Sequence, residues 1–156
     1  MSQSLHDILL HVHSVGRWLL MLLLLIAIFN SLVAGQRPFI KSDARTGLIL
    51  TIVADTMLLL GLALWFFGPF GYAVIQSMGF KAAMQNDGAR FFVMEHTVGM
   101  LIAIVLIHIG KAQAKKKIID RKKHVRTMVF YLVALLVILA SVPWPFLTAG
   151  AGRGWF

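Results

Sequence analysis

The stretch HVHSVGRWLLMLLLLIAIFNSLVA, residues 11–34, carries the longest apolar run of the chain and decides what kind of protein this is. The whole run extends from Leu5 to Ala34 and exceeds the ~20 residues that a helix needs to cross the hydrocarbon core of a membrane. We do not expect a cleaved signal peptide, because histidines and an arginine interrupt the run and no small-residue cleavage site is evident. The run is therefore predicted to stay in the protein as a membrane-spanning helix.

Three further runs are long enough to cross a membrane: Leu48 to Phe67, Phe91 to Ile109 and Val125 to Val142. The chain is 59% hydrophobic and only 13% charged, which lies far outside the range of soluble domains. These observations predict an all-α integral membrane protein, a four-helix bundle of up-down topology that forms a single domain over residues 1–156. We expect the helices at about residues 5–34, 46–67, 90–111 and 123–142.

The net charge of +9 is concentrated in the first and third connections, which share one side of the predicted bundle. Eleven of the fifteen basic residues lie there: Arg37, Lys41, Arg45, Lys111, Lys115, Lys116, Lys117, Arg121, Lys122, Lys123 and Arg126. By the positive-inside rule this side faces the cytoplasm, and both termini face outward. The basic loops are then expected to meet water and membrane lipid rather than nucleic acid, and a protein partner for them is left open. The chain has no cysteine, which excludes thiolate ligands and disulfides.

A four-residue motif occurs twice, as His13-Ser14-Val15-Gly16 and as His96-Thr97-Val98-Gly99, each time near the start of an apolar run. If both runs cross the membrane in the same direction, both imidazoles lie at the same depth. A glycine one turn after a histidine leaves a notch that can admit a flat group such as a porphyrin. Two opposed neutral imidazoles suit a six-coordinate haem iron, so the motif predicts His13 and His96 as ligands of one haem b. The alternative is that each histidine lies in the interface and is hydrogen-bonded to a neighbouring helix.

Two ionisable residues are added to the predicted cofactor site, Arg17 and Glu95. Arg17 lies one turn deeper than the first histidine of the motif and needs a partner or a path to water. Its expected partners are Glu95, Asp55 or a haem propionate, with snorkelling toward the membrane surface as the alternative. Asp55 falls near the bilayer midplane, where a carboxylate must be protonated or paired, and is therefore a candidate functional residue.

His11, His108 and Asp55 are secondary candidates for a metal ligand, and we interpret His108 and His124 as interfacial residues. The connection over residues 68–89 is the longest segment outside the spans. Tyr72 to Ala83 is expected to form a short amphipathic helix that covers the outer end of the bundle. The glycine-rich tail to Phe156 is expected to pack back on the same end.

Several segments resemble a family of small bacterial four-span proteins commonly labelled cytochrome b-like: His13-Ser14 with Arg17-Trp18, residues 58–62, Arg90-Phe91-Phe92 with Glu95-His96, and residues 142–146. The resemblance covers most of the chain and implies haem b in a helical bundle in the bacterial inner membrane. The Glu95-His96 segment is also similar to the haem-ligand helices of haem A synthase. Relatives often have a histidine in the second helix where this chain has Asp55, so the resemblance leaves His13 and His96 as the stronger ligand pair.

The expected role is electron transfer, with a membrane quinol or a larger respiratory complex as partner, and whether the chain is itself an oxidoreductase is left open. A rival hypothesis is a proton- or ion-coupled channel or transporter subunit that uses Asp55, Arg17 and Glu95 as a buried charge relay. A third hypothesis is a structural subunit, or a homo-oligomer, joined through the apolar faces of the second and fourth helices.

Overall fold

The computed structural model describes residues 2–150, and this part of the chain is helical, with no strand in that range. The four long helices are α1 (Gln3–Val33), α2 (Lys41–Phe67), α6 (His96–Ala112) and α7 (Asp120–Ser141). Shorter elements lie between and after them: α3 (Tyr72–Met78), α4 (Phe80–Gln85), α5 (Asp87–Arg90), the π-helix η1 (Phe91–Glu95) and the 3₁₀ helices η2 (Gln113–Lys115) and η3 (Thr148–Gly150). The expectation of an all-helical protein with four helices long and apolar enough to cross a membrane is confirmed.

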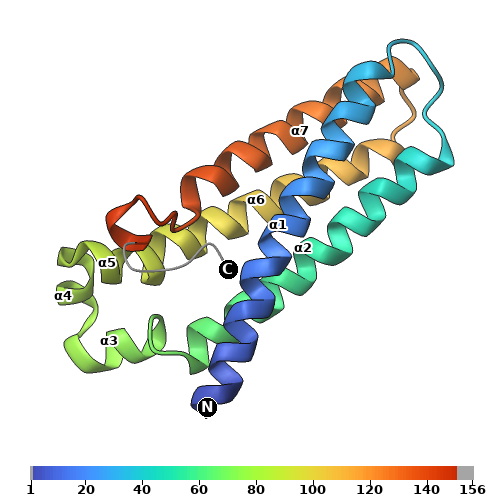
Figure 1. Cartoon of the computed structure of the whole chain (residues 1–156). Helices are drawn as coiled ribbons and strands as arrows, with labels where there is room; N and C mark the ends of the chain where they lie inside the picture. The colour runs from blue at the N-terminus through green and yellow to red at the C-terminus, as the bar shows by residue number, and fades with distance from the viewer. Residues whose placement is uncertain (1, 151–156) are drawn as a thin grey trace.

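The four long helices pack as a ring of neighbours in which α1 contacts α2 and α7, and α6 contacts the same two helices. The connections 34–40 and 116–119 lie at the same end of the molecule, and α3, α4 and α5 lie at the other end with the N-terminus (Figure 1). Phe39 of the first connection touches His124 near the start of α7, with 5.0 Å between the ring centres. The two basic connections therefore share one end of the bundle.

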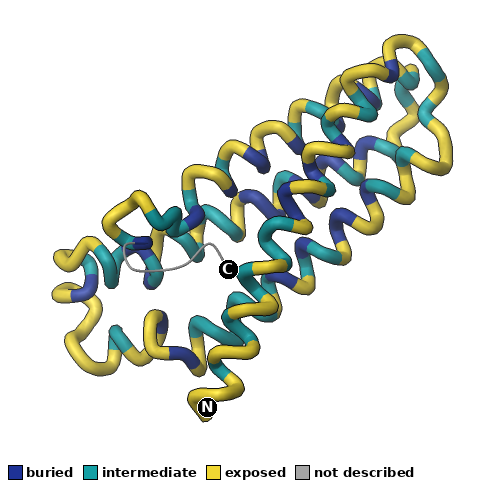
Figure 2. The backbone as a smooth tube through the Cα atoms, in the orientation of Figure 1, coloured by how far each residue is buried: buried dark blue, intermediate teal, exposed yellow. Residues whose placement is uncertain are grey.

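The core and the outer surface of the bundle are both apolar. Residues such as Leu24, Leu50 and Ile107 are fully buried where the helices meet. The outer faces are exposed along all four long helices (Figure 2) and carry large hydrophobic side chains, among them Leu59 and Phe67. An apolar surface of this extent is suited to contact with lipid rather than with water.

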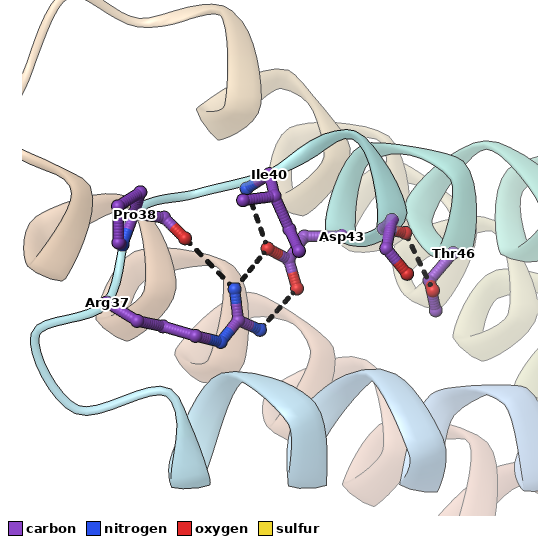
Figure 3. A network of polar contacts seen from close by, with 6 residues as sticks. Arg37, Pro38, Ile40, Asp43 and Thr46 are labelled. Atoms are coloured by element: carbon purple, nitrogen blue, oxygen red, sulfur yellow. Dashed lines mark hydrogen bonds and ion pairs between the residues drawn. The ribbon is translucent and has the colours of Figure 1, made fainter.

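Helix α2 begins at Lys41, five residues earlier than the sequence suggested. The carboxylate of Asp43 accepts a hydrogen bond from the backbone N–H of Ile40 at 2.9 Å and so caps the first turn. The guanidinium of Arg37 binds both oxygens of Asp43 at 2.7 Å (Figure 3), and these hydrogen bonds raise the pKa of Arg37. The connection is thus folded back onto the helix, which a pattern of apolar residues does not reveal.

The connection over residues 68–89 differs from the single helix expected over Tyr72 to Ala83. Gly79 has φ +79°, a conformation that favours glycine and that an α-helix cannot contain, so it separates α3 from α4. Asn86 then caps α5 by accepting the backbone N–H of Ala89 at 2.9 Å. The expected packing of the glycine-rich tail stays a prediction, since residues 151–156 lie outside the described part of the chain.

The cap on α2 can be tested by the substitution Asp43→Ala. We expect a loss of about 1 kcal/mol of stability, because the Ile40 N–H at the start of the helix loses its side-chain acceptor. Thermal unfolding in detergent, followed by circular dichroism, measures the loss. Lys41→Ala, at an exposed position of the same turn, is the matched control and should shift stability by less than about 0.5 kcal/mol. Equal unfolding temperatures for Asp43→Ala and wild type would contradict the assignment.

Candidate functional site

The structure brings His13 and His96, the two histidines of the repeated motif, together at one end of the bundle. Their ring centres lie 6.3 Å apart and the ring planes make an angle of 71°. His13 lies in the N-terminal half of α1 and His96 is the first residue of α6, so residues 83 positions apart in the sequence form one site. Both side chains are partly buried within the bundle.

A backbone carbonyl fixes which nitrogen of His96 is available for a ligand. Nδ1 of His96 lies 2.8 Å from the carbonyl oxygen of Ser141, the last residue of α7. A carbonyl oxygen can only accept, so Nδ1 carries the hydrogen and donates it. In the neutral imidazole Nε2 then holds the free lone pair, which is the arrangement that holds a metal-ligating histidine in one tautomer and orientation.

A π-helical turn, η1, leads directly into His96. The backbone N–H of His96 donates to the carbonyl of Phe91, five residues earlier, in place of the usual four. The hydroxyl of Thr97 donates to the carbonyl of Phe92 at 3.1 Å, again five residues back. The extra residue shifts the rotation of everything that follows on α6, and π-helical turns are frequent at functional sites. No pattern of residues in this segment predicts the π-helical turn.

On the other side of the site, His13 lies against Gly61 of α2. A Cβ atom at position 61 would lie 3.2 Å from Cε1 of His13, closer than nearly all real Cβ contacts. Nδ1 of His13 is buried, and no described residue offers it a hydrogen bond. A buried nitrogen without a partner in the protein is uncommon, and such a nitrogen is free to bind a ligand. Gly61 had no assigned role in the sequence, where it was one glycine within an apolar run.

The glycines of the motif, Gly16 and Gly99, do not face open space. A side chain at position 16 would collide with Met57 of α2, and one at position 99 would collide with Ser141 of α7. Both glycines therefore allow neighbouring helices to pack closely, as small residues commonly do in membrane bundles. Their predicted contact with a porphyrin stays a prediction.

Arg17 lies at the same end of the bundle, above two indole rings. Its guanidinium carbon is 5.4 Å from the ring centre of Trp18 and 5.7 Å from that of Trp144, within the range of a cation–π contact. The two indoles touch edge to face with their centres 6.0 Å apart. Two aromatic rings thus lie against this guanidinium, and the Arg17 side chain is only partly buried.

The expected ion pairs of Arg17 with Glu95 or Asp55 are replaced by others. Glu95 pairs with Arg90, with 2.6 Å between Oε1 and Nε, and Asp55 pairs with His108, with 2.8 Å between Oδ1 and Nε2. Glu95 is therefore paired five residues away along the chain, and Asp55 of α2 is paired with a residue of α6. These pairs correct the expected pairing of Arg17 with Glu95 or Asp55. The rotation of each helix about its axis decides which residues face each other, and hydropathy does not encode that rotation.

The remaining histidines are scattered. His11 is exposed on α1, and His124 is buried beside Phe39 at the basic end. Within residues 2–150 no three side chains of the types His, Cys, Asp and Glu gather closely enough to hold a metal ion by themselves. A cofactor held by two imidazoles is the arrangement that the His13 and His96 geometry can serve.

The chain matches no protein-family model, no curated protein and no solved structure. Its resemblance to the cytochrome b-like family therefore stays a prediction.

The close approach of α6 and α7 at Gly99 can be tested by a double-mutant cycle with Ser141. Gly99→Ala should lower the free energy of unfolding by about 1–3 kcal/mol, because the new methyl group overlaps the Ser141 side chain. Ser141→Gly removes the atoms in its way while keeping the carbonyl that binds His96, so the same substitution should cost less than half as much in that background. Chemical unfolding in detergent gives the four free energies. Additive effects would show that the two positions do not touch.

Proposed function

We propose that this chain is a haem b-binding membrane protein that transfers electrons, with His13 and His96 as the two axial ligands. The separation of the two rings carries the proposal. An imidazole nitrogen coordinates a metal at about 2 Å and lies roughly 1 Å from its ring centre, so two imidazoles on opposite sides of one metal have centres about 6 Å apart. The observed separation is 6.3 Å.

A direct hydrogen bond between the rings fits this separation less well. With about 3 Å between the two nitrogens, the ring centres would lie no more than about 5 Å apart. The observed separation is thus longer than a direct hydrogen bond between the rings allows and close to the separation expected for two imidazoles on one metal. The hydrogen bond from Nδ1 of His96 to Ser141 leaves Nε2 of His96 as the nitrogen for that atom.

The surroundings of the two histidines suit a redox cofactor. A haem iron with two histidine ligands has no open position, so it supplies reversible one-electron transfer rather than oxygen chemistry. The rings of Phe91 and Phe92 lie 6.2 Å and 6.5 Å from the ring of His96 and restrict the access of water. Arg17 contributes a positive charge at the same end, which favours an anionic group such as a propionate.

The proposal includes an orientation in the bacterial inner membrane. The basic connections share one end of the bundle, so the positive-inside rule assigns that end to the cytoplasm. An up-down topology with both termini outside follows, and the two histidines then lie toward the outer leaflet. A membrane quinol, or another subunit of a respiratory complex, is the corresponding redox partner.

Optical spectra of the protein purified after expression with haem supplied test the proposed ligands. We expect a low-spin haem b spectrum from wild type, which His13→Ala and His96→Ala should abolish or convert to high spin because each removes one axial ligand. His11→Ala, two residues away on the same helix, is the control and should keep the wild-type spectrum. Wild-type protein without a Soret band would disprove the proposal.

The orientation can be tested with single cysteines, because the chain has none of its own. A membrane-impermeant maleimide should label Ser4→Cys in intact cells, whereas Lys116→Cys should react only after the cells are opened. Both positions are exposed, so access to the reagent depends on the side of the membrane. The reverse labelling pattern would place the basic end outside.

A further inference from the structure

A half-exposed hydrogen-bonded pair lies on two of the long apolar helices, away from the two motif histidines. Asp55 of α2 and His108 of α6 both fall in segments long and apolar enough to cross a membrane. Nε2 of His108 is 2.8 Å from Oδ1 of Asp55, and each side chain keeps 48% of its surface exposed. Placing a polar group against hydrocarbon costs free energy, and such groups mark functional sites more often than structural ones.

The pair offers two hydrogen-bond acceptors to whatever lies beside it. An ionised carboxylate only accepts, so Nε2 of His108 donates to Asp55, and in the neutral ring Nδ1 is then an acceptor. The second oxygen of Asp55 is an acceptor as well. Lipid tails supply no donor, so a ligand that satisfies these atoms must bring a hydroxyl or an N–H into the bilayer.

Apolar side chains surround the pair at helical spacings on both helices. Ile52 and Leu59 are exposed next to Asp55 on α2, and Leu101 and Val105 are exposed on the turns of α6 before His108. A ligand with a polar head and a hydrocarbon tail would therefore find acceptors for the head and an aliphatic surface for the tail.

We propose that Asp55 and His108 bind the headgroup of a membrane quinol, with a quinol hydroxyl donating to the carboxylate or to Nδ1 of the imidazole. This inference rests on the proposed electron-transfer function and names its substrate class. A second copy of the chain fits the pair less well, since it would present the same acceptors. The oxidised quinone has carbonyl oxygens in place of hydroxyls, so the site selects the reduced form.

The position of the pair relates it to the proposed haem ligands. His108 lies twelve residues after His96 on α6, about 18 Å along the helix axis at about 1.5 Å per residue. One helix therefore carries both a ligand of the proposed haem and a contact of the proposed quinol, and the pair lies nearer the basic end.

Binding can be measured by isothermal titration calorimetry of the full chain in detergent under argon, with decyl-ubiquinol and decyl-ubiquinone as probes. Wild type should bind the quinol at least tenfold more tightly than the quinone. The double variant Asp55→Leu with His108→Leu removes both polar groups without leaving one unpaired, and its Kd for the quinol should rise at least tenfold. His11→Leu, which removes an exposed histidine from another helix, should bind as wild type does.

The Soret band and the oligomeric state are recorded for the same samples. An unchanged Soret band in the double variant, together with lost quinol binding, supports the proposal. Quinol binding by the double variant with the wild-type Kd would overturn it, as would a wild-type dimer that binds no quinol and becomes monomeric in the double variant. Wild type that binds the quinol but no haem would refute the proposed haem function and leave the quinol site standing.

Discussion

Hydrocarbon offers no hydrogen-bond partners, and this constraint organises the whole molecule. Every backbone polar group within a membrane span must be satisfied inside its own helix, and this chain has four helices long and apolar enough to be such spans, with no strand in residues 2–150. The same constraint makes the few polar side chains within the spans informative. The contact of Asp55 with His108 locates one proposed site, and the bond of His96 to Ser141 together with the unpartnered Nδ1 of His13 locates the other.

Close helix packing in this bundle is achieved by glycines opposite larger side chains. Gly16 packs against Met57, and Gly99 packs against Ser141. Gly110 packs against the ring of Tyr131, which is only 1% exposed. In a membrane, helices gain nothing from leaving lipid for an equally apolar neighbour, so association depends on close contact and on hydrogen bonds between helices. The bond from His96 to the carbonyl of Ser141 is one such bond, and it links α6 to α7 next to the site.

The two ends of the bundle have different chemistry. At the basic end, Arg37 and Asp43 close the first connection, and His124 and Gln113 are each only 1% exposed. At the opposite end, imidazoles, indoles and phenyl rings gather around His13, His96 and Arg17. The proposed orientation assigns the basic end to the cytoplasmic surface, and the proposed haem lies at the opposite end.

The sequence by itself predicted the number of long apolar helices and their approximate limits. It also predicted that His13 and His96 lie close together. The length of an apolar run sets the length of a helix, and the position of a histidine within the run sets its depth. Both follow directly from the sequence, because a helix rises by a constant distance per residue. The tertiary structure decided the rest: the partners of Asp55 and Glu95, the contact of Gly61 with His13, the carbonyl that orients His96, and the π-helical turn before it. These features depend on how each helix is rotated about its axis and how closely it approaches its neighbours. Hydropathy leaves rotation undetermined when both the core and the lipid-facing surface are apolar, and only the packed bundle fixes it.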